Sequence, residues 1–182
     1  MPENTALHAR ARKIKLFLMD VDGTLTDGGV CLIATPGVEG FSEMKVFSAR
    51  DGAGLTLAHI MGIKTGFITG RKSSAVQQRA NELGVSFVYL GQKTKTAAYE
   101  ECLKKAGVTD EETAYLGDDL PDMPLAQRAG LAVAVADAAP ELKAVCDYTT
   151  QAKGGKGAAR EVVELILKSQ GRWDEAVPRA QA

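Results

Sequence analysis

Short apolar runs alternate with longer segments of helical period along nearly the whole chain, and this alternation constrains the fold more than any other feature. The apolar runs of strand length cover residues 14–19, 64–68, 86–90, 113–116, 131–135 and 148–150. The segments of helical period cover about 53–61, 73–83, 96–106, 140–145 and 158–167, and a further one ends near residue 129. Strands that alternate with helices are typical of a parallel sheet flanked by helices. We therefore predict an α/β fold.

Residues 20–51 break this alternation. They contain two short candidate strands, 29–33 and 44–47, separated by the Gly- and Pro-rich stretch ATPGVEGFSE over 34–43, which predicts a β-hairpin over about 29–47. At 182 residues the chain is long enough for one domain, which we place at 13–170. The polar segments 1–12 and 171–182 are expected to be flexible.

Composition excludes several classes of function. A formal net charge of −1 offers no basic surface for nucleic acid, so no nucleic-acid partner is expected. The three cysteines form no CxxC pair, which argues against a disulfide framework or a zinc site. No apolar run approaches the roughly 20 residues that span a bilayer. We expect a soluble, cytoplasmic protein with no membrane partner.

Polar residues follow the predicted strands at the ends where a parallel sheet binds its ligands. They form four groups in chain order: Asp20 and Asp22; Thr69, Gly70 and Arg71; Lys95; and Asp118, Asp119 and Asp122. Crowded carboxylates repel one another unless a hard divalent cation neutralises them, and Mg²⁺ prefers oxygen ligands and phosphate. One carboxylate could attack phosphorus while another carries the proton, and a hydroxyl and an ammonium could hold the phosphoryl oxygens. This inventory predicts Mg²⁺-dependent phosphoryl chemistry.

The four groups, in this order, resemble the four motifs of the haloacid dehalogenase superfamily of phosphatases. The resemblance implies a Rossmann-like sheet, with Asp20 as nucleophile and Asp22 as general acid and base. It implies that Mg²⁺ is held by the Asp20 carboxylate, the Asp22 backbone carbonyl and Asp118. It also implies that the phosphoryl group is bound by Thr69, Gly70 and Lys95, and that the metal ligands are supported by Asp119 and Asp122.

A narrower resemblance covers about residues 13–173. The stretches DVDGTLTDGG, KVFSARDGAGL, GIKTGFITGRKS and AYLGDDLPDMP are similar to those of 3-deoxy-D-manno-octulosonate 8-phosphate phosphatases, enzymes of lipopolysaccharide precursor synthesis. That group lacks a cap domain, in agreement with the 47 positions that separate Asp22 from Thr69. It forms homotetramers in which the hairpin and the C-terminal tail help to cover a neighbour's site. The resemblance thus implies a phosphorylated acidic sugar as substrate, with further contacts from Arg71, Arg50, Lys156 and Arg160.

Alternatives stay open at this point. The long hairpin loop leaves room for a phosphatase of a nine-carbon acid sugar 9-phosphate, or for a subunit associated with phenylphosphate carboxylase. A phospho-receiver domain also gathers acids, a Thr and a Lys around Mg²⁺, but there the acidic pair comes first and here Asp118 and Asp119 come last. Asp119 could equally cap a helix. Arg71 could be a solvated surface residue, and Gly154 to Gly157 could be either an anion-binding loop or a hinge.

Overall fold

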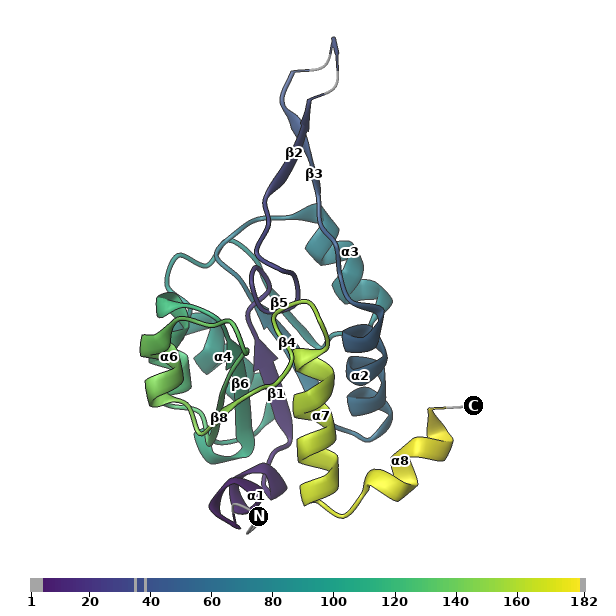
Figure 1. The fold of residues 1–182 in the computed structure, drawn as a ribbon, viewed down its shortest axis with the longest axis vertical. Coiled ribbons are helices and arrows are strands. Elements are labelled where there is room, and N and C mark those ends of the chain that lie inside the picture. Colours follow the sequence, from purple (N-terminus) through teal and green to yellow (C-terminus); the bar gives the residue numbers. More distant parts are fainter. Residues whose placement is uncertain (1–4, 35, 38, 181–182) are drawn as a thin grey trace.

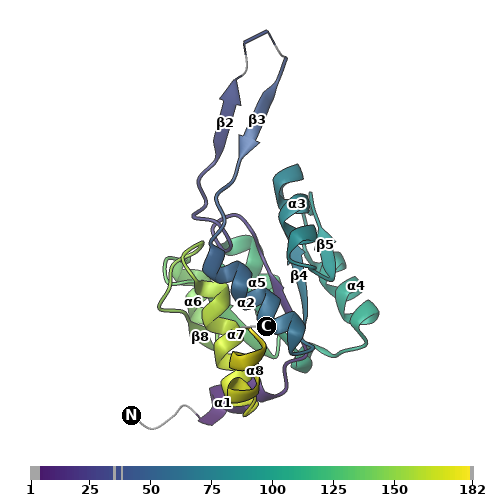
Figure 2. The ribbon, with the colours of Figure 1, turned by 90° about the vertical axis from the view of Figure 1, so that its right-hand side faces the viewer.

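The computed structural model describes residues 5–34, 36–37 and 39–180, and these form an α/β layered structure (Figures 1 and 2). The main sheet has six strands in the order β5-β4-β1-β6-β7-β8, and every neighbouring pair is parallel. The strands are β1 (Leu16–Met19), β4 (Lys64–Ile68), β5 (Phe87–Tyr89), β6 (Thr113–Gly117), β7 (Leu131–Ala134) and β8 (Tyr148–Thr149). The predicted fold class is therefore confirmed, with β1 in the middle of the sheet.

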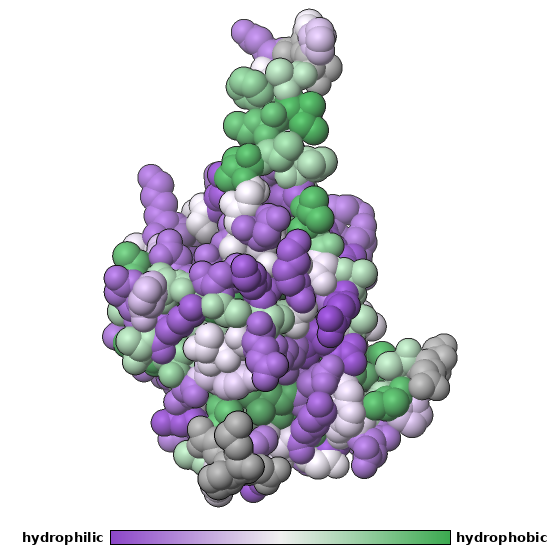
Figure 3. Space-filling model, viewed as in Figure 1, coloured by the Kyte–Doolittle hydropathy of each residue, from purple (hydrophilic) through white to green (hydrophobic). Residues whose placement is uncertain are grey.

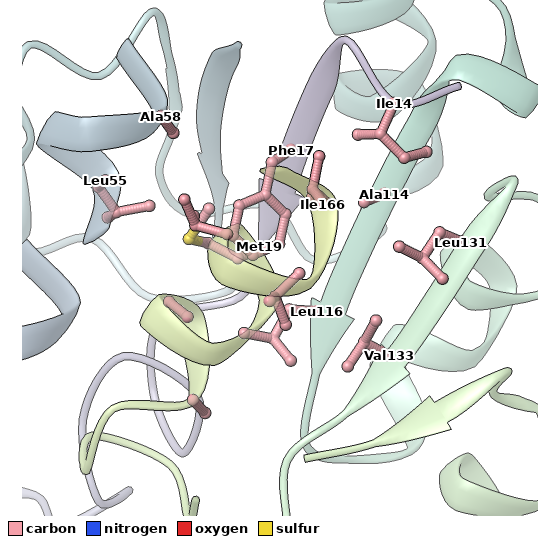
Figure 4. Packing of buried hydrophobic residues seen from close by; sticks show 14 of the residues in the cluster. Ile14, Phe17, Met19, Leu55, Ala58, Ala114, Leu116, Leu131, Val133 and Ile166 are labelled. Atoms are coloured by element: carbon pink, nitrogen blue, oxygen red, sulfur yellow. The ribbon is translucent and has the colours of Figure 1, made fainter. Parts of the chain in front are cut away.

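Both faces of β1 are buried. Phe17 and Met19 belong to the larger core cluster, which includes side chains from α2 (Ala49–Ile60) and α7 (Ala158–Ser169) (Figure 4). The alternate residues Leu16 and Leu18 belong to a second cluster on the other face, together with side chains from α4 (Thr96–Ala106) and α5 (Met123–Ala126). Because all four side chains are fully buried, the strand reads as a continuous apolar run.

Helix α2 begins four residues earlier than the sequence predicts. Ser48 is its N-cap and accepts a hydrogen bond from the Asp51 backbone N–H. The two glycines that follow are poor helix formers, and they hid this first turn from the sequence pattern. Packing requires Gly54, because a Cβ there would lie 2.8 Å from the Arg160 backbone, whereas a Cβ on Gly52 would lie 2.3 Å from the movable end of the Arg79 side chain.

Two further helices connect strands of the sheet. They are α3 (Ser74–Glu82) and α6 (Pro140–Val145), with two 3₁₀ turns over Asp110–Glu112 and Leu120–Asp122. Between β1 and β4 the described residues form only a hairpin and α2, and between β4 and α4 they form only α3 and β5.

The hairpin projects beyond the body of the molecule (Figure 1). It consists of β2 (Cys31–Ala34) and β3 (Phe41–Met44), paired antiparallel. The second strand lies at 41–44 and not at the predicted 44–47, because residues 45–47 return to the body, where Phe47 packs against the core. The predicted loop over 34–43 is shortened accordingly, and its residues Thr35 and Val38 lie outside the described residues.

Both ends of the described chain are helical where the sequence predicts flexible segments. Helix α1 (Thr5–Arg12) buries Leu7 and Ala11 and packs on α7. Helix α8 (Trp173–Arg179) buries Ala176 completely and contacts α2 and α7. The core is reached by Leu7 and Ala11 of α1 and by Ala176 and the partly buried Trp173 of α8, too few residues for an apolar period to be visible in the sequence. None of the helices in the described part of the chain is long and apolar enough to cross a membrane.

Candidate active site

The four predicted groups meet at the carboxyl ends of the central strands, around one cavity of about 260 Å³. Its lining comprises Asp20, Asp22, Thr69, Gly70, Arg71, Gln92, Lys93, Lys95, Asp118, Asp119, Pro121 and Asp122. Arg50 and Arg160 line a different cavity of about 270 Å³, and Lys156 is exposed and lines neither. A larger hollow of about 620 Å³ lies at the opposite edge of the sheet, where charged residues such as Lys15 and Glu112 pair with each other.

The turn after β1 joins two carboxylates from different strands. Gly23 has φ of +92°, and a Cβ at this position would lie 2.1 Å from Asp118 Oδ2. Thr24 Oγ1 donates to Asp118 Oδ1 at 2.9 Å. Glycine is therefore required here both for backbone conformation and for close approach. The turn thereby holds Asp118, at the end of β6, next to Asp20, at the end of β1.

Lys95 bridges the acids. Its ammonium donates to Asp20 Oδ1 at 2.5 Å and to Asp122 Oδ1 at 2.7 Å, and all three residues are at most 7% exposed. Burial acts to lower the pKa of Lys95, but the charges of Asp20 and Asp122 outweigh it and raise the pKa. Lys95 is the N-cap residue of α4, where a cation is unfavourable unless it faces anions. Its position at the start of the helix is therefore explained by the two carboxylates that it contacts.

Asp122 holds the loop after β6 that carries Asp118 and Asp119. Besides Lys95, its Oδ1 accepts from the Tyr115 hydroxyl at 2.7 Å, while its Oδ2 accepts from the backbone N–H groups of Asp118 at 3.0 Å and Asp119 at 3.3 Å. Asp119 itself is exposed and is the N-cap of the 3₁₀ turn Leu120–Asp122. The Asp122 carboxylate thus accepts four hydrogen bonds, and these hold Lys95, Tyr115 and the backbone of residues 118 and 119 in place.

These acids fit a hard divalent cation. Carboxylate oxygens of Asp20, Asp118 and Asp122 lie within 4.8 Å of one another. Burial raises the pKa of Asp20 to about 7 against the opposing charge of Lys95, and burial raises the pKa of Asp118 to about 6. A cation would relieve both penalties. Since donors already occupy Asp122, the free acceptors belong to Asp20 and Asp118.

Asp22 faces a second set of charges that motif reasoning missed. Its Oδ1 forms an ion pair with Lys45, while Oδ2 is buried and has no hydrogen-bond partner among the described residues. Arg71 Nε lies 3.8 Å from Oδ2, and Arg71 Nη2 donates to Glu43 Oε1 at 2.7 Å. Lys45 and Glu43 come from the returning side of the hairpin, and no local pattern marks them in the sequence.

The glycine-rich loop over 153–157 packs against the turn after β1. A Cβ on Gly154 would lie 1.8 Å from the carbonyl oxygen of Gly23, and Gly155 N–H donates to the carbonyl of Thr24 at 2.9 Å. These contacts show backbone packing, and they test neither of the two functions left open for Gly154 to Gly157, an anion-binding loop or a hinge. The buried Asp51, which the sequence reasoning also missed, accepts from the N–H of Gly157 at 3.0 Å and so anchors the start of α7.

Comparison with known proteins decides the family. A model of haloacid dehalogenase-like hydrolases matches residues 87–162. The chain is 43% identical over 175 residues to 3-deoxy-D-manno-octulosonate 8-phosphate phosphatase KdsC of Escherichia coli K12, covering 96% of this chain and 90% of the relative. The chain belongs to the haloacid dehalogenase-like hydrolases. The resemblance inferred from the motifs is thereby confirmed, and the receiver-domain alternative is set aside.

Solved relatives of this haloacid dehalogenase-like hydrolase share its whole fold. The phosphatase from Moraxella catarrhalis, in complex with magnesium ion, phosphate ion and a KDO molecule, superposes with a TM-score of 0.91 at 41% identity, covering 97% of this chain and 99% of that one. The Yersinia pestis phosphatase gives a TM-score of 0.87 at 41% identity, covering 93% and 89%. The fold is therefore shared along nearly the whole length of these chains.

Proposed function

We propose that this chain is a Mg²⁺-dependent phosphatase that hydrolyses 3-deoxy-D-manno-octulosonate 8-phosphate to the free sugar acid and phosphate. One observation carries the proposal: all four motif groups converge on a single cavity in a chain that matches the Escherichia coli phosphatase over 96% of its length. The Moraxella relative is in complex with magnesium ion, phosphate ion and KDO, which are a metal ion and the two products of such a reaction.

Asp20 is the proposed nucleophile. Lys95 donates to its Oδ1 at 2.5 Å and so fixes the carboxylate in the cavity. The bond from phosphorus to the sugar oxygen breaks as the aspartyl-phosphate forms. The proposed ligands of the phosphoryl oxygens are Thr69, which is 1% exposed, and the Lys95 ammonium, and both residues line the cavity. They would stabilise the charge as it shifts onto the leaving group.

Asp22 is the proposed carrier of the proton. In the first step it protonates the departing sugar oxygen, and in the second it takes a proton from the water that attacks the aspartyl-phosphate. That second step releases phosphate and restores Asp20. Oδ2 of Asp22, which accepts no hydrogen bond from the described residues, is the proposed site of this proton.

The proposed metal ligands are the carboxylates of Asp20 and Asp118 and the backbone carbonyl of Asp22. When bound, Mg²⁺ supplies positive charge that lets the phosphate approach the acids and stabilises the transition state. Asp122 keeps this arrangement in place through its bonds to Lys95 and to the backbone of residues 118 and 119.

We further propose a homotetramer in which the hairpin helps to cover a neighbour's site. The support is the apolar surface of the hairpin (Figure 3), with six large exposed side chains: Val30, Leu32, Ile33, Phe41, Met44 and Val46. A two-stranded hairpin that stands alone is only marginally stable in water, and a partner would bury these residues. We place the enzyme in the cytoplasm, whose reducing conditions suit its three free cysteines.

A substrate panel tests the function. Phosphate release is measured for the eight-carbon sugar acid 8-phosphate, a nine-carbon acid sugar 9-phosphate and phenyl phosphate, each with Mg²⁺ and after removal of the metal with EDTA. We expect the eight-carbon substrate to have the highest kcat/KM and turnover to stop without metal. Preference for the nine-carbon substrate or for phenyl phosphate would favour the corresponding alternative. Undiminished turnover in EDTA would refute the metal assignment.

A further inference from the structure

Lys45 is a buried cation next to the site that none of the four motifs contains. It follows β3 directly, on the path from the hairpin to α2, and its side chain is only 2% exposed. A buried ammonium is costly unless it is paired. Its partners are two carboxylates, Asp22 through Oδ1 and Glu43 through Oε1, the latter at 3.5 Å.

The Lys45 pair leaves the two oxygens of Asp22 in different environments. Oδ1 is anchored by the ammonium, while Oδ2 is buried and has no hydrogen-bond partner in the described part of the chain. Arg71 Nε lies 3.8 Å from Oδ2, beyond hydrogen-bond distance. A carboxylate anchored through one oxygen presents the other in a defined direction.

Lys45 is itself held in place by a second ion pair. Glu43, the second partner of Lys45, accepts from Arg71 Nη2 at 2.7 Å, and Arg71 belongs to the cavity lining. The end of β3 is thus tied to the site through two cations, one on each side of Asp22. The position of Asp22 therefore depends on the returning strand of the hairpin.

We propose that Lys45 is a positioning residue that aims the free oxygen of Asp22 at the leaving oxygen of the substrate. This inference rests on the proposed function, in which Asp22 donates the proton as the phosphorus–oxygen bond breaks. A sugar alkoxide is a poor leaving group and needs that proton, whereas p-nitrophenolate leaves readily without it. Loss of Lys45 should therefore affect the two kinds of phosphate ester unequally.

The test compares kcat/KM, which reports formation of the aspartyl-phosphate, for the sugar 8-phosphate and for p-nitrophenyl phosphate. For Lys45→Met we expect kcat/KM to fall about 100-fold with the sugar phosphate, the order of a general-acid contribution, and less than about tenfold with the aryl ester. Most of the loss should lie in kcat. Lys45→Arg, which keeps the ion pair, should recover most of the activity, and Asp22→Asn should show the same substrate dependence more strongly.

Lys13→Met is the matched control, because Lys13 forms an ordinary exposed ion pair with Glu111 at the opposite edge of the sheet. It should leave both substrates unaffected. Circular dichroism and size exclusion check fold and assembly, and Lys45→Gln takes the place of Lys45→Met should the latter not fold. Equal losses on both substrates would reduce Lys45 to a structural role, and undiminished activity would remove it from the mechanism; either result overturns the inference. If the wild type hydrolyses no alkyl phosphate, the proposed function has failed instead.

Discussion

Replacing Asp20 by Asn should abolish turnover and yet stabilise the metal-free protein at alkaline pH. Asp20 is 6% exposed, and burial raises its pKa from the ordinary 3.8 to about 7, with Lys95 opposing and Asp122 adding to the effect. The folded protein therefore binds this proton more tightly than the unfolded chain. The resulting contribution to the free energy of unfolding is complete below pH about 4 and is lost as the pH rises through about 7.

The difference between a pKa of 3.8 and one of about 7 corresponds to about 4 kcal/mol. This is an upper value for the gain on substitution, because an Asn amide forms a weaker bond to Lys95 than the carboxylate does. We expect Asp20→Asn to exceed the wild type by about 2–4 kcal/mol near pH 8 in EDTA, and by clearly less near pH 5.

Urea denaturation at the two pH values measures the stability, and phosphate release with Mg²⁺ measures turnover. A variant less stable than the wild type near pH 8 would refute the reasoning about burial, as would a difference that does not shrink near pH 5. Turnover close to that of the wild type would refute the nucleophile assignment.

Three further changes test other parts of the structure. Gly23→Ala puts a Cβ 2.1 Å from Asp118 Oδ2 at a positive φ, so we expect a loss of about 2 kcal/mol or more in urea denaturation and a fall in Mg²⁺ affinity by calorimetry; a neutral result would contradict the close approach. Asp51→Ala leaves the N–H of Gly157 without its acceptor and should cost about 2–4 kcal/mol, measured in the same way. Phe41, 70% exposed on the hairpin, should be essential to assembly, so Phe41→Asp should yield monomers in light scattering, whereas an unchanged mass would exclude the hairpin from the interface.

Local signals in the sequence predicted most of the fold. Strand β1 was visible because both its faces are buried, which makes four consecutive residues apolar. Helix α2 was placed too late because Gly52 and Gly54 weaken the local signal, although the close approach of the Arg160 backbone requires Gly54. The terminal helices α1 and α8 were missed because few of their side chains reach the core. Propensity is a local quantity, and packing against distant segments overrides it.

The sequence by itself determined which polar residues gather at one edge of the sheet, because parallel strands carry their C-terminal residues to the same edge, so that acids as distant as Asp20 and Asp118 were predicted to meet. Only the tertiary structure decided how those residues are held. The Lys45–Asp22 pair and the four bonds to Asp122 depend on the distances and burial of groups from separate segments. The energy of a charge pair is set by separation and desolvation, neither of which can be read along a chain.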